Sequence, residues 1–330
     1  MSKLKDNSVD LIITSPPYPM VKMWDDVFCE ASSLIKEYLF AENGAASYKL
    51  MHKVLENIWS ECIRVLKPGS FFCINIGDAA RKVGDGFCLY PNHATITESL
   101  SNKNLIVLPM IHWFKPTNAP NKFMGSGMLP AGAYVKMEHE YILVFKKPGK
   151  RSFTEEEKTI RRRSAFFWEE RNLWFSDVWS IKGKKQKIKD QTAARERSAA
   201  FPEELVNRLI NMFSVQGDTV LDPFIGTGTT LKTCIQNGRA CIGFEIDESM
   251  RPLISKSTNN LFENSKLYND KRLKAHESFI KTRENVKYIN ENYGFPVVTR
   301  QERYIIFPEL SELNSESQNE NDSFFAEYKF

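Results

Sequence analysis

Four residues near the start of the chain, Ser15 to Tyr18, carry groups that could hold an amino group and a planar ring. They read Ser-Pro-Pro-Tyr and follow the apolar run from Val9 to Thr14, which predicts a buried strand. The two prolines lack backbone donors and restrict φ, so the loop is stiff and leaves carbonyl oxygens free to accept hydrogen bonds. Tyr18 adds a flat face with a polar tip. Because open α/β sheets bind ligands beyond the carboxyl ends of their strands, we expect a binding site here.

A second segment with binding chemistry lies late in the chain, between Thr219 and Thr230. It reads Thr-Val-Leu-Asp-Pro-Phe-Ile-Gly-Thr-Gly-Thr-Thr and predicts a strand that ends in Asp222 and a glycine loop that opens a helix. Glycines let the backbone approach a ligand closely. About twenty residues further on, a second predicted strand ends near Glu245, whose carboxylate could accept hydrogen bonds from ribose hydroxyls of an adenosine-containing ligand. The alternative is two glycine-bounded strands with surface acids. The absence of Gly-Lys-Ser/Thr argues against a P-loop NTPase.

The two segments together resemble a known enzyme family. Thr14-Ser-Pro-Pro-Tyr18 and Asp222-Pro-Phe-x-Gly-x-Gly-Thr-Thr are similar to motifs of the S-adenosylmethionine-dependent DNA amino-methyltransferases of bacterial restriction-modification systems. Their order, with the tetrapeptide first and the cofactor loop late, resembles the permuted β group. Weaker matches lie at Arg64–Gly69, His139–Lys146 and Ala200–Glu203. The resemblance implies S-adenosyl-L-methionine as cofactor and double-stranded DNA as substrate.

The resemblance implies that the tetrapeptide Ser15, Pro16, Pro17 and Tyr18 is catalytic. An exocyclic amino nitrogen is a poor nucleophile because its lone pair is delocalised into the ring, and the Ser15 hydroxyl and Pro16 carbonyl are suited to accept its hydrogens. Tyr18 would stack on a base flipped out of the duplex. Transfer would be direct, and the sequence lacks the Pro-Cys dipeptide of enzymes that methylate a ring carbon of cytosine. Serine at the first position resembles the cytosine-N4 enzymes, with adenine-N6 methylation as the alternative.

The remaining site residues are also implied by the resemblance. The cofactor-binding residues would be Asp222, Pro223, Phe224, Gly226, Gly228, Glu245, Phe201 and Pro202. The DNA-phosphate contacts would be Arg161, Arg162, Arg163, Lys182, Lys184, Lys185 and Lys187. We interpret the tryptophans of the same region, Trp168, Trp174 and Trp179, as core residues. No metal is implied.

Charge, cysteine content and the lack of targeting signals add little to the functional interpretation. The net charge is +4, yet Lys146 to Arg163 holds eight Lys or Arg residues and Lys182 to Arg197 holds seven. Such clusters are commonly a solvated face, so the motifs must decide whether they contact nucleic acid. The six cysteines include no Cys-x-x-Cys pair, which favours free thiols over a disulfide framework or a zinc site. Without a signal-peptide pattern or a long apolar run, we expect a cytoplasmic protein.

Helical and strand patterns alternate along most of the chain. We expect helices at 48–65, 92–102 and 203–213, and strands at 70–76, 105–114, 140–146, 218–221 and 240–247. This alternation predicts an α/β fold with a doubly wound, mostly parallel, Rossmann-like sheet. The expected parts are a catalytic half at 1–147, an irregular target-recognition insert at 148–197 that is not a βα unit, a cofactor-binding half at 198–310 and a frayed polar tail at 311–330.

One family feature is missing near the amino end. Many relatives have a strand ending in Gly-Asp before the catalytic strand, whereas only eight residues precede Val9 here. Either that strand is absent from this sequence, or Tyr304–Phe307, followed by Glu309, replaces it. Two other functions stay open: a non-catalytic DNA-binding component with a decayed cofactor fold, and amino-methylation of RNA or protein. The resemblance also suggests a cognate restriction endonuclease as partner, while the oligomeric state is not indicated.

Overall fold

The strand that precedes the tetrapeptide lies at the centre of the sheet. The computed structural model describes residues 1–84, 86–116, 124–183, 202–284, 286–318 and 321–330. Strand β1 (Val9–Thr14) has the predicted bounds, and all six of its residues are buried. It pairs in parallel with β2 (Leu66–Ile76) on one side and β11 (Thr219–Asp222) on the other. Burial on both faces explains why Leu11 to Ile13 are apolar without interruption, because buried parallel strands lack polar alternation.

The sheet extends from β1 in both directions. Its order is β10 (Val178–Ser180), β6 (Ile111–Phe114), β9 (His139–Lys146), β2, β1, β11 and β12 (Ala240–Gly243), and the short β5 (Ile106–Val107) pairs with β9. Strand β9 runs antiparallel to its neighbours β2 and β6, and the other neighbours along this order pair in parallel. The predicted doubly wound, mostly parallel sheet is therefore confirmed.

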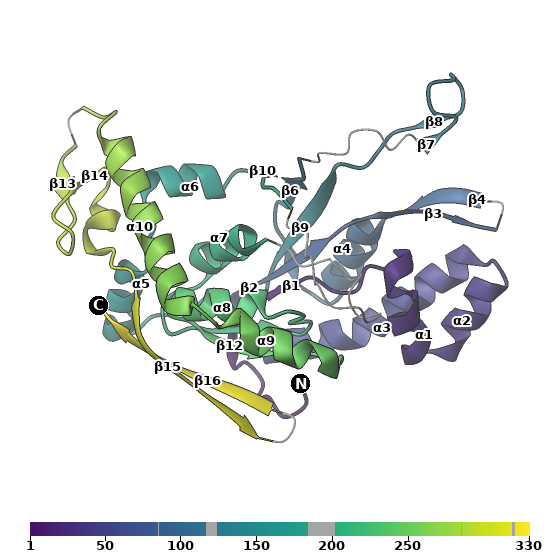
Figure 1. Cartoon of the computed structure of the whole chain (residues 1–330), viewed down its shortest axis with the longest axis horizontal. Helices are drawn as coiled ribbons and strands as arrows, with labels where there is room; N and C mark the ends of the chain where they lie inside the picture. Colours follow the sequence, from purple (N-terminus) through teal and green to yellow (C-terminus); the bar gives the residue numbers. More distant parts are fainter. Residues whose placement is uncertain (85, 117–123, 184–201, 285, 319–320) are drawn as a thin grey trace.

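Helices cover both faces of the sheet (Figure 1). On one face, α3 (Gly44–Val65) and α4 (Asn92–Asn102) bury their apolar sides against β1 and β2, together with α1 (Asp25–Ala31) and α2 (Ser33–Phe40). The short helix η1 (Lys22–Trp24) precedes α1. On the other face lie α7 (Glu203–Phe213) and α8 (Thr229–Gln236). The helices predicted near 48–65, 92–102 and 203–213 are confirmed.

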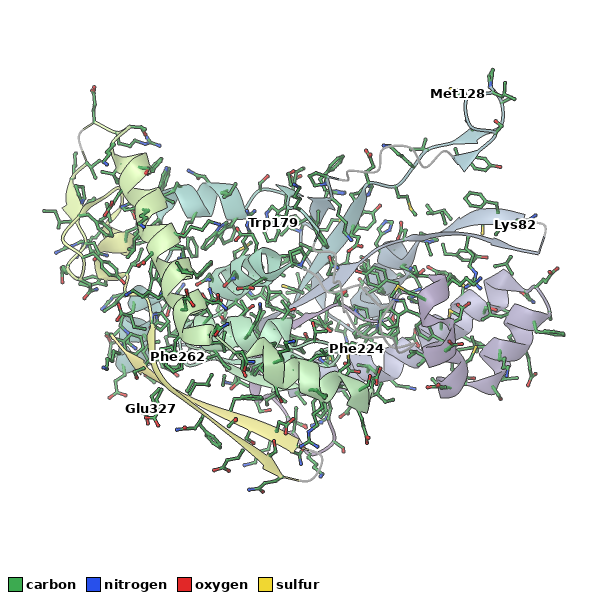
Figure 2. All side chains as sticks on the ribbon, in the orientation of Figure 1. Lys82, Met128, Trp179, Phe224, Phe262 and Glu327 are labelled. Carbon is green, nitrogen blue, oxygen red and sulfur yellow. The ribbon has the colours of Figure 1, made fainter. Side chains whose placement is uncertain are left out.

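Two antiparallel arms project beyond the carboxyl end of β2 and were not predicted. One is β3 (Ala79–Val83) with β4 (Gly86–Tyr90), and the other is β7 (Met124–Gly125) with β8 (Ala133–Tyr134). The arms meet where the rings of Phe87 and Tyr134 stack at 5.0 Å. Figure 2 shows Lys82 on the first arm and Met128 at the tip of the second. Both arms start on the edge of the sheet that carries the tetrapeptide.

The predicted insert is more regular than its sequence suggested. It forms α5 (Glu155–Arg163), α6 (Trp168–Trp174) and β10, and β10 joins the main sheet beside β6. The prediction that this region lacks a βα unit is wrong, because short charged helices leave no clear apolar period. Trp174 and Trp179 are buried and Trp168 is partly buried, so the core interpretation is confirmed for the first two. The indole N–H of Trp179 also donates a hydrogen bond to the Trp174 carbonyl at 3.0 Å, which satisfies this buried polar group.

Helix α6 packs against a carboxyl-terminal module. This module comprises η3 (Glu248–Met250), α9 (Arg251–Ser257), α10 (Leu261–Ile280), β13 (Tyr288–Ile289), β14 (Pro296–Val297) and η4 (Arg300–Tyr304). The buried ion pair between Arg272 of α10 and Glu170 of α6, at 2.6 Å, links the two regions. Ile305 and Phe307 are buried in a separate apolar cluster with Phe167. The prediction that Tyr304–Phe307 supplies a cofactor strand is therefore wrong, and β12 is the last strand of the sheet within the described residues.

The expected frayed tail is instead an ordered hairpin. Strands β15 (Glu309–Gln318) and β16 (Asn321–Lys329) pair antiparallel and extend beneath the module in Figure 1. The Tyr328 hydroxyl donates to the Ile235 carbonyl at 2.8 Å, and Asp322 pairs with Arg251. The polar stretch before residue 322 obscured the alternating pattern of β16. Among the described residues, no helix is long and apolar enough to cross a bilayer.

Candidate active site

The tetrapeptide forms the loop at the carboxyl end of β1. Pro16 and Pro17 are buried, whereas Ser15 and Tyr18 are partly exposed. The Tyr18 ring lies against the bare backbone of Gly77, since a Cβ placed on Gly77 would come within 3.0 Å of the Tyr18 Cε2 atom. The loop therefore presents a hydroxyl and an aromatic side chain from a rigid base, as the sequence predicted.

Two side chains from neighbouring strands hold the Tyr18 hydroxyl. It donates to the Glu140 carboxylate at 3.0 Å, and the Asn75 amide donates to the Tyr18 oxygen at 2.7 Å and to Glu140 at 2.9 Å. The Ser15 hydroxyl lies 3.2 Å from that of Tyr18. Burial and then the charge of Glu140 raise the pKa of Tyr18 well above its ordinary value, so the phenol keeps its proton. Sequence reasoning missed Asn75 and Glu140, although each is a polar residue near the end of a predicted strand.

Asp222 joins this loop to the glycine loop. Its carboxylate accepts hydrogen bonds from the Thr14 hydroxyl at 2.7 Å, the Thr230 hydroxyl at 2.6 Å and the Phe224 amide at 3.1 Å. The side chain is fully buried, and burial raises the pKa of Asp222 to about 6. Both of its oxygens are used inside the protein. Asp222 therefore shapes the loop between β11 and α8, and it couples that loop to the residue preceding Ser15.

The glycine loop needs its glycines for conformation and for space. Gly226 and Gly228 have φ values of 53° and 82°, in the left-handed region. A Cβ on Gly228 would also approach the Ser257 hydroxyl to 2.8 Å. The Glu245 carboxylate accepts hydrogen bonds from the amides of Gly226, Ile246 and Asp247 at 2.9, 3.0 and 2.9 Å. One acidic side chain thus ties the glycine loop to the turn that follows β12.

The side chains around Glu245 suit a nucleoside. Glu245 and Asp247 provide carboxylate acceptors for hydroxyl groups, while Phe244 and Ile246 are 36% and 89% exposed. These four residues line an open cavity of about 1790 Å³ that extends from β12 toward β15 and β16. Uncovered apolar side chains beside carboxylates match the apolar ring and polar sugar of such a ligand. The tetrapeptide does not line this cavity.

Comparison with known proteins agrees with this geometry. The N6/N4 methyltransferase model, described as DNA methylase, matches residues 9–256 and so includes the tetrapeptide, the glycine loop and Glu245. The chain belongs to this DNA methylase family. It is therefore a DNA methyltransferase, and its cofactor is S-adenosyl-L-methionine.

Two relatives and one solved structure support the same assignment. The chain is 48% identical to the type II methyltransferase M.MthZI of Methanothermobacter thermautotrophicus, across 99% of this chain and 92% of that relative. It is 46% identical to the type II methyltransferase M.MjaI of Methanocaldococcus jannaschii, across 78% of this chain and 87% of that relative. TTHA0409 of Thermus thermophilus, solved in complex with S-adenosyl-L-methionine, superposes with a TM-score of 0.60 at 30% identity, covering 79% of this chain and 89% of that one.

Several of the residues that the resemblance assigns to the cofactor lie in the glycine loop and the turn after β12. Gly226, Gly228 and Glu245 are close together there. Pro223 is buried, and the Phe224 ring packs edge-on against Trp59 at 6.2 Å. Pro202 is buried at the start of α7. Phe201 lies outside the described residues.

The predicted DNA contacts fall into separate places. Arg161, Arg162 and Arg163 are on α5, and Ser164, the next residue, accepts a hydrogen bond from the amide of Gln216, just before β11 begins. These arginines thus lie at the amino ends of the parallel strands, on the edge of the sheet opposite the tetrapeptide. The structure does not bring them to the catalytic loop, because the chain leaves antiparallel β9 at that far edge.

Lys182 has the opposite placement. It is exposed just after β10, which runs parallel to β6, and both of these strands end on the tetrapeptide's edge of the sheet. The other basic residues predicted for this segment, Lys184, Lys185 and Lys187, lie outside the described residues.

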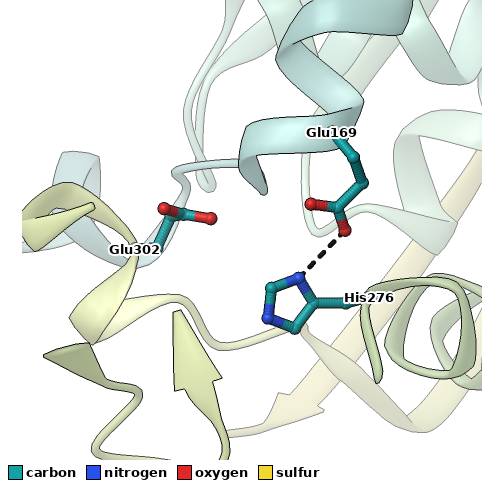
Figure 3. A group of neighbouring side chains, drawn as sticks. All are labelled: Glu169, His276 and Glu302. Carbon is teal, nitrogen blue, oxygen red and sulfur yellow. Dashed lines mark hydrogen bonds and ion pairs between the residues drawn. The ribbon is translucent and has the colours of Figure 1, made fainter. Parts of the chain in front are cut away.

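One cluster of possible metal ligands lies away from this edge. Glu169, His276 and Glu302 each offer a ligand atom within 4.8 Å of the others (Figure 3). In this structure His276 bonds to Glu169 at 2.9 Å and to the Pro296 carbonyl at 2.9 Å, while Glu302 accepts from the amide of Trp168 at 2.8 Å. Burial acts to lower the pKa of His276, but Glu169 and the Pro296 carbonyl outweigh it and raise the pKa. We interpret the cluster as a polar link between α6 and the carboxyl-terminal module.

Proposed function

We propose that this enzyme transfers a methyl group to the exocyclic N4 nitrogen of cytosine in double-stranded DNA, after flipping the base. The supporting observation is the position of Ser15 and Tyr18, partly exposed at the end of β1 and joined to the glycine loop through the Thr14–Asp222 hydrogen bond. This arrangement suits a substrate amino group held beside a bound methyl donor. Serine at the first position of the tetrapeptide favours cytosine over adenine.

The protein's part in the reaction is positioning. Ser15 and the Pro16 carbonyl would accept the amino hydrogens, and Tyr18 would stack on the flipped base. When bound, S-adenosyl-L-methionine supplies a methyl group activated by its sulfonium. Ser15 and the Pro16 carbonyl would hold the amino nitrogen in line with that methyl group, and the proton that nitrogen gives up after transfer would pass to solvent. Held acceptors favour this step by stabilising charge that develops on nitrogen.

DNA would approach the edge of the sheet that holds the tetrapeptide. Lys182 and Lys115 follow β10 and β6 at this edge, and the two arms project beyond it. Phosphate contacts in this region would position the duplex without reading its sequence. Within the 148–197 segment, we assign target recognition to the part that follows β10. Helix α5, which lies at the opposite edge of the sheet, would have a structural role only.

Labelled cofactor and unmethylated DNA test the base assignment. After incubation, the DNA is digested to nucleosides and the label is located, with Ser15→Ala as the matched control. We expect label in N4-methylcytosine and a large loss with Ser15→Ala. Label in N6-methyladenine would overturn the cytosine assignment. Failure to label cytosine or adenine amino groups in any DNA would overturn the proposed transfer as a whole.

We further propose a type II modification role, as in the two similar methyltransferases, with a restriction endonuclease of the same specificity as partner. Such an enzyme protects one short sequence on both DNA strands. Mapping methylated bases in the genome of a host that expresses the protein tests this. Methylation confined to one short sequence context supports the role, and methylation without sequence preference contradicts it.

A further inference from the structure

A chain of hydrogen bonds leads from the catalytic loop to Glu140. The Ser15 hydroxyl lies 3.2 Å from the Tyr18 hydroxyl, which donates to the Glu140 carboxylate at 3.0 Å. Glu140 lies near the start of β9, two strands away from β1 in the sheet. The chain therefore connects the tetrapeptide to a residue 122 positions later in the sequence.

The number of protons available determines which group donates in each of these hydrogen bonds. A carboxylate can only accept hydrogen bonds, and a phenol has one proton to donate. Since the Tyr18 proton is used on Glu140, the contact between Tyr18 and Ser15 requires Ser15 to be the donor. The Ser15 proton then points toward Tyr18, and the lone pairs of the Ser15 oxygen face the substrate side with one long contact, from the Asn75 amide at 3.4 Å. That contact is weak enough for a substrate amino group to replace it.

We propose that Glu140 is a positioning residue that orients the Ser15 hydroxyl as a hydrogen-bond acceptor for the amino group of the target base. The inference rests on the proposed function and adds to it the residue that sets the polarity of the catalytic serine. Glu140 does so through Tyr18 and has no direct contact with Ser15 among the hydrogen bonds of the described residues. If Tyr18 donated to Ser15 instead, its proton would occupy one of the lone pairs needed for the substrate.

Two neighbours stabilise this arrangement. The Asn75 amide donates to the Tyr18 oxygen at 2.7 Å and to Glu140 at 2.9 Å, and it makes a longer contact of 3.4 Å with the Ser15 oxygen. Lys115 pairs with the second oxygen of Glu140 and lies over the Trp113 ring at 4.2 Å. Lys115 thus compensates the charge of a carboxylate that is only 16% exposed. Burial and the Glu140 charge also keep Tyr18 protonated, as this direction requires.

The substitution Glu140→Gln tests the proposal because it keeps the shape of the side chain and adds a donor. With the new amide donating to the Tyr18 oxygen, the phenol is free to donate to Ser15, which reverses the chain. We expect kcat on duplex DNA to fall about 30- to 100-fold, somewhat less than when a polar catalytic group is removed outright, because Ser15 itself is kept. KM for DNA and Kd for the cofactor should change less than about 2-fold. Glu140→Asp, which retains a carboxylate, should recover part of the loss.

Tyr18→Phe separates this role from a structural one. Without the phenol oxygen, Glu140 reaches Ser15 only through the long 3.4 Å contact of Asn75, which cannot reverse the Ser15 hydroxyl because Asn75 only donates in it. Glu140→Gln should therefore add less than about 3-fold to the loss of the Tyr18→Phe variant. A structural role would instead lower cofactor affinity and stability equally in both backgrounds. Glu138→Gln is the matched control. Glu138 lies two residues before Glu140 and pairs with Lys136, so this variant should keep the wild-type kcat.

Each outcome decides the inference. Wild-type kcat in Glu140→Gln, or equal additional losses with and without the Tyr18 hydroxyl, would overturn it. If Glu140→Gln does not fold, Tyr18→Phe alone still tests the chain, because an unchanged kcat with the ring retained would overturn it. A wild-type enzyme that places no label on DNA amino groups would refute the proposed function, whatever the Glu140 variants show.

Discussion

Two loops follow adjacent parallel strands, β1 and β11, yet they are held in different ways. In the catalytic loop, side chains bond to one another and to neighbouring strands, as when Tyr18 donates to Glu140. In the glycine loop, the main contact is between backbone amides and the single carboxylate of Glu245. Beside it, the apolar Ile246 stands uncovered. The first loop is complete without a ligand, whereas the second has surface that a ligand would cover.

This difference separates the two tasks of the enzyme. A loop that must hold an amino group in one orientation benefits from a rigid polar network, because small misplacements slow a reaction strongly. A loop that must admit and release a cofactor at each turnover benefits from an open surface. Variants of the two loops should therefore affect turnover and cofactor affinity separately.

The largest expected effect is on turnover, from Tyr18→Ala. Loss of a stacking ring costs about 1–3 kcal/mol per base, so kcat on DNA should fall roughly 10- to 100-fold. Cofactor affinity, measured by calorimetry, should change less than about 2-fold because Tyr18 lies in the other loop. Tyr18→Phe keeps the ring and should lose less. Equal losses in kcat and cofactor affinity would refute the separation of tasks.

Glu245→Ala should have the converse effect. It removes a carboxylate that holds the Gly226 amide and that we expect to bind the ribose. Hydrogen bonds to charged groups contribute about 1.5–3 kcal/mol, so Kd for the cofactor should rise about 10-fold or more. At saturating cofactor, kcat should stay near the wild-type value. Glu248→Ala, three residues later on the same cavity wall, is the control. Unchanged cofactor affinity would show that Glu245 only shapes the turn.

Asp222→Asn tests the hydrogen bonds by which Asp222 connects the catalytic loop to the glycine loop. Burial raises the pKa of Asp222 from 3.8 to about 6, so the folded protein binds this proton more tightly than the unfolded chain does. The resulting contribution to the free energy of unfolding is complete below pH 3.8 and is lost as the pH rises through 6. Wild-type protein should therefore lose about 1 kcal/mol more stability between pH 5 and pH 7 than Asp222→Asn does. The Thr230 hydroxyl can rotate to accept from Asn, which keeps this connection. Urea unfolding at both pH values measures the difference, and parallel profiles would contradict it.

The smallest expected effect comes from Gly77→Ala. The added methyl would meet Tyr18 Cε2 at 3.0 Å and Glu140 Cγ at 3.2 Å, so the ring must shift by a few tenths of an ångström. We expect kcat to fall about 3- to 5-fold with cofactor affinity unchanged, since modest displacement costs less than the loss of the ring. Gly86→Ala is the control, because its nearest neighbour would lie 3.7 Å away. A larger loss in Gly86→Ala would exclude the steric explanation.

Much of the site could be predicted because its residues follow strands with strong apolar patterns. The bounds of β1 matched, and Ser15 and Glu245 lie at strand ends as expected. Asn75 and Glu140 were missed because a polar residue at one end of a strand does not by itself indicate a site. Their role depends on strand order, which places β2 next to β1 and β9 next to β2 in space.

Other features depend on similar long-range information. Arg161 to Arg163 were predicted as DNA contacts, and the antiparallel direction of β9 places them at the edge of the sheet opposite the tetrapeptide. The β15–β16 hairpin was obscured because composition does not reveal pairing between two polar strands. In each case, the missing information was a long-range contact.

The hydrogen bond between Thr14 and Asp222 has a consequence for how the protein is made. These residues are 208 positions apart, and they join the earliest strand of the sheet to one of its last. At 5–20 residues per second, the ribosome needs roughly 10–40 s to add the intervening chain. During that interval β1 can pair with β2, but the glycine loop that would bind the cofactor has not yet been synthesised. The nascent enzyme thus cannot bring Ser15 beside the glycine loop until the chain has been made at least as far as Asp222.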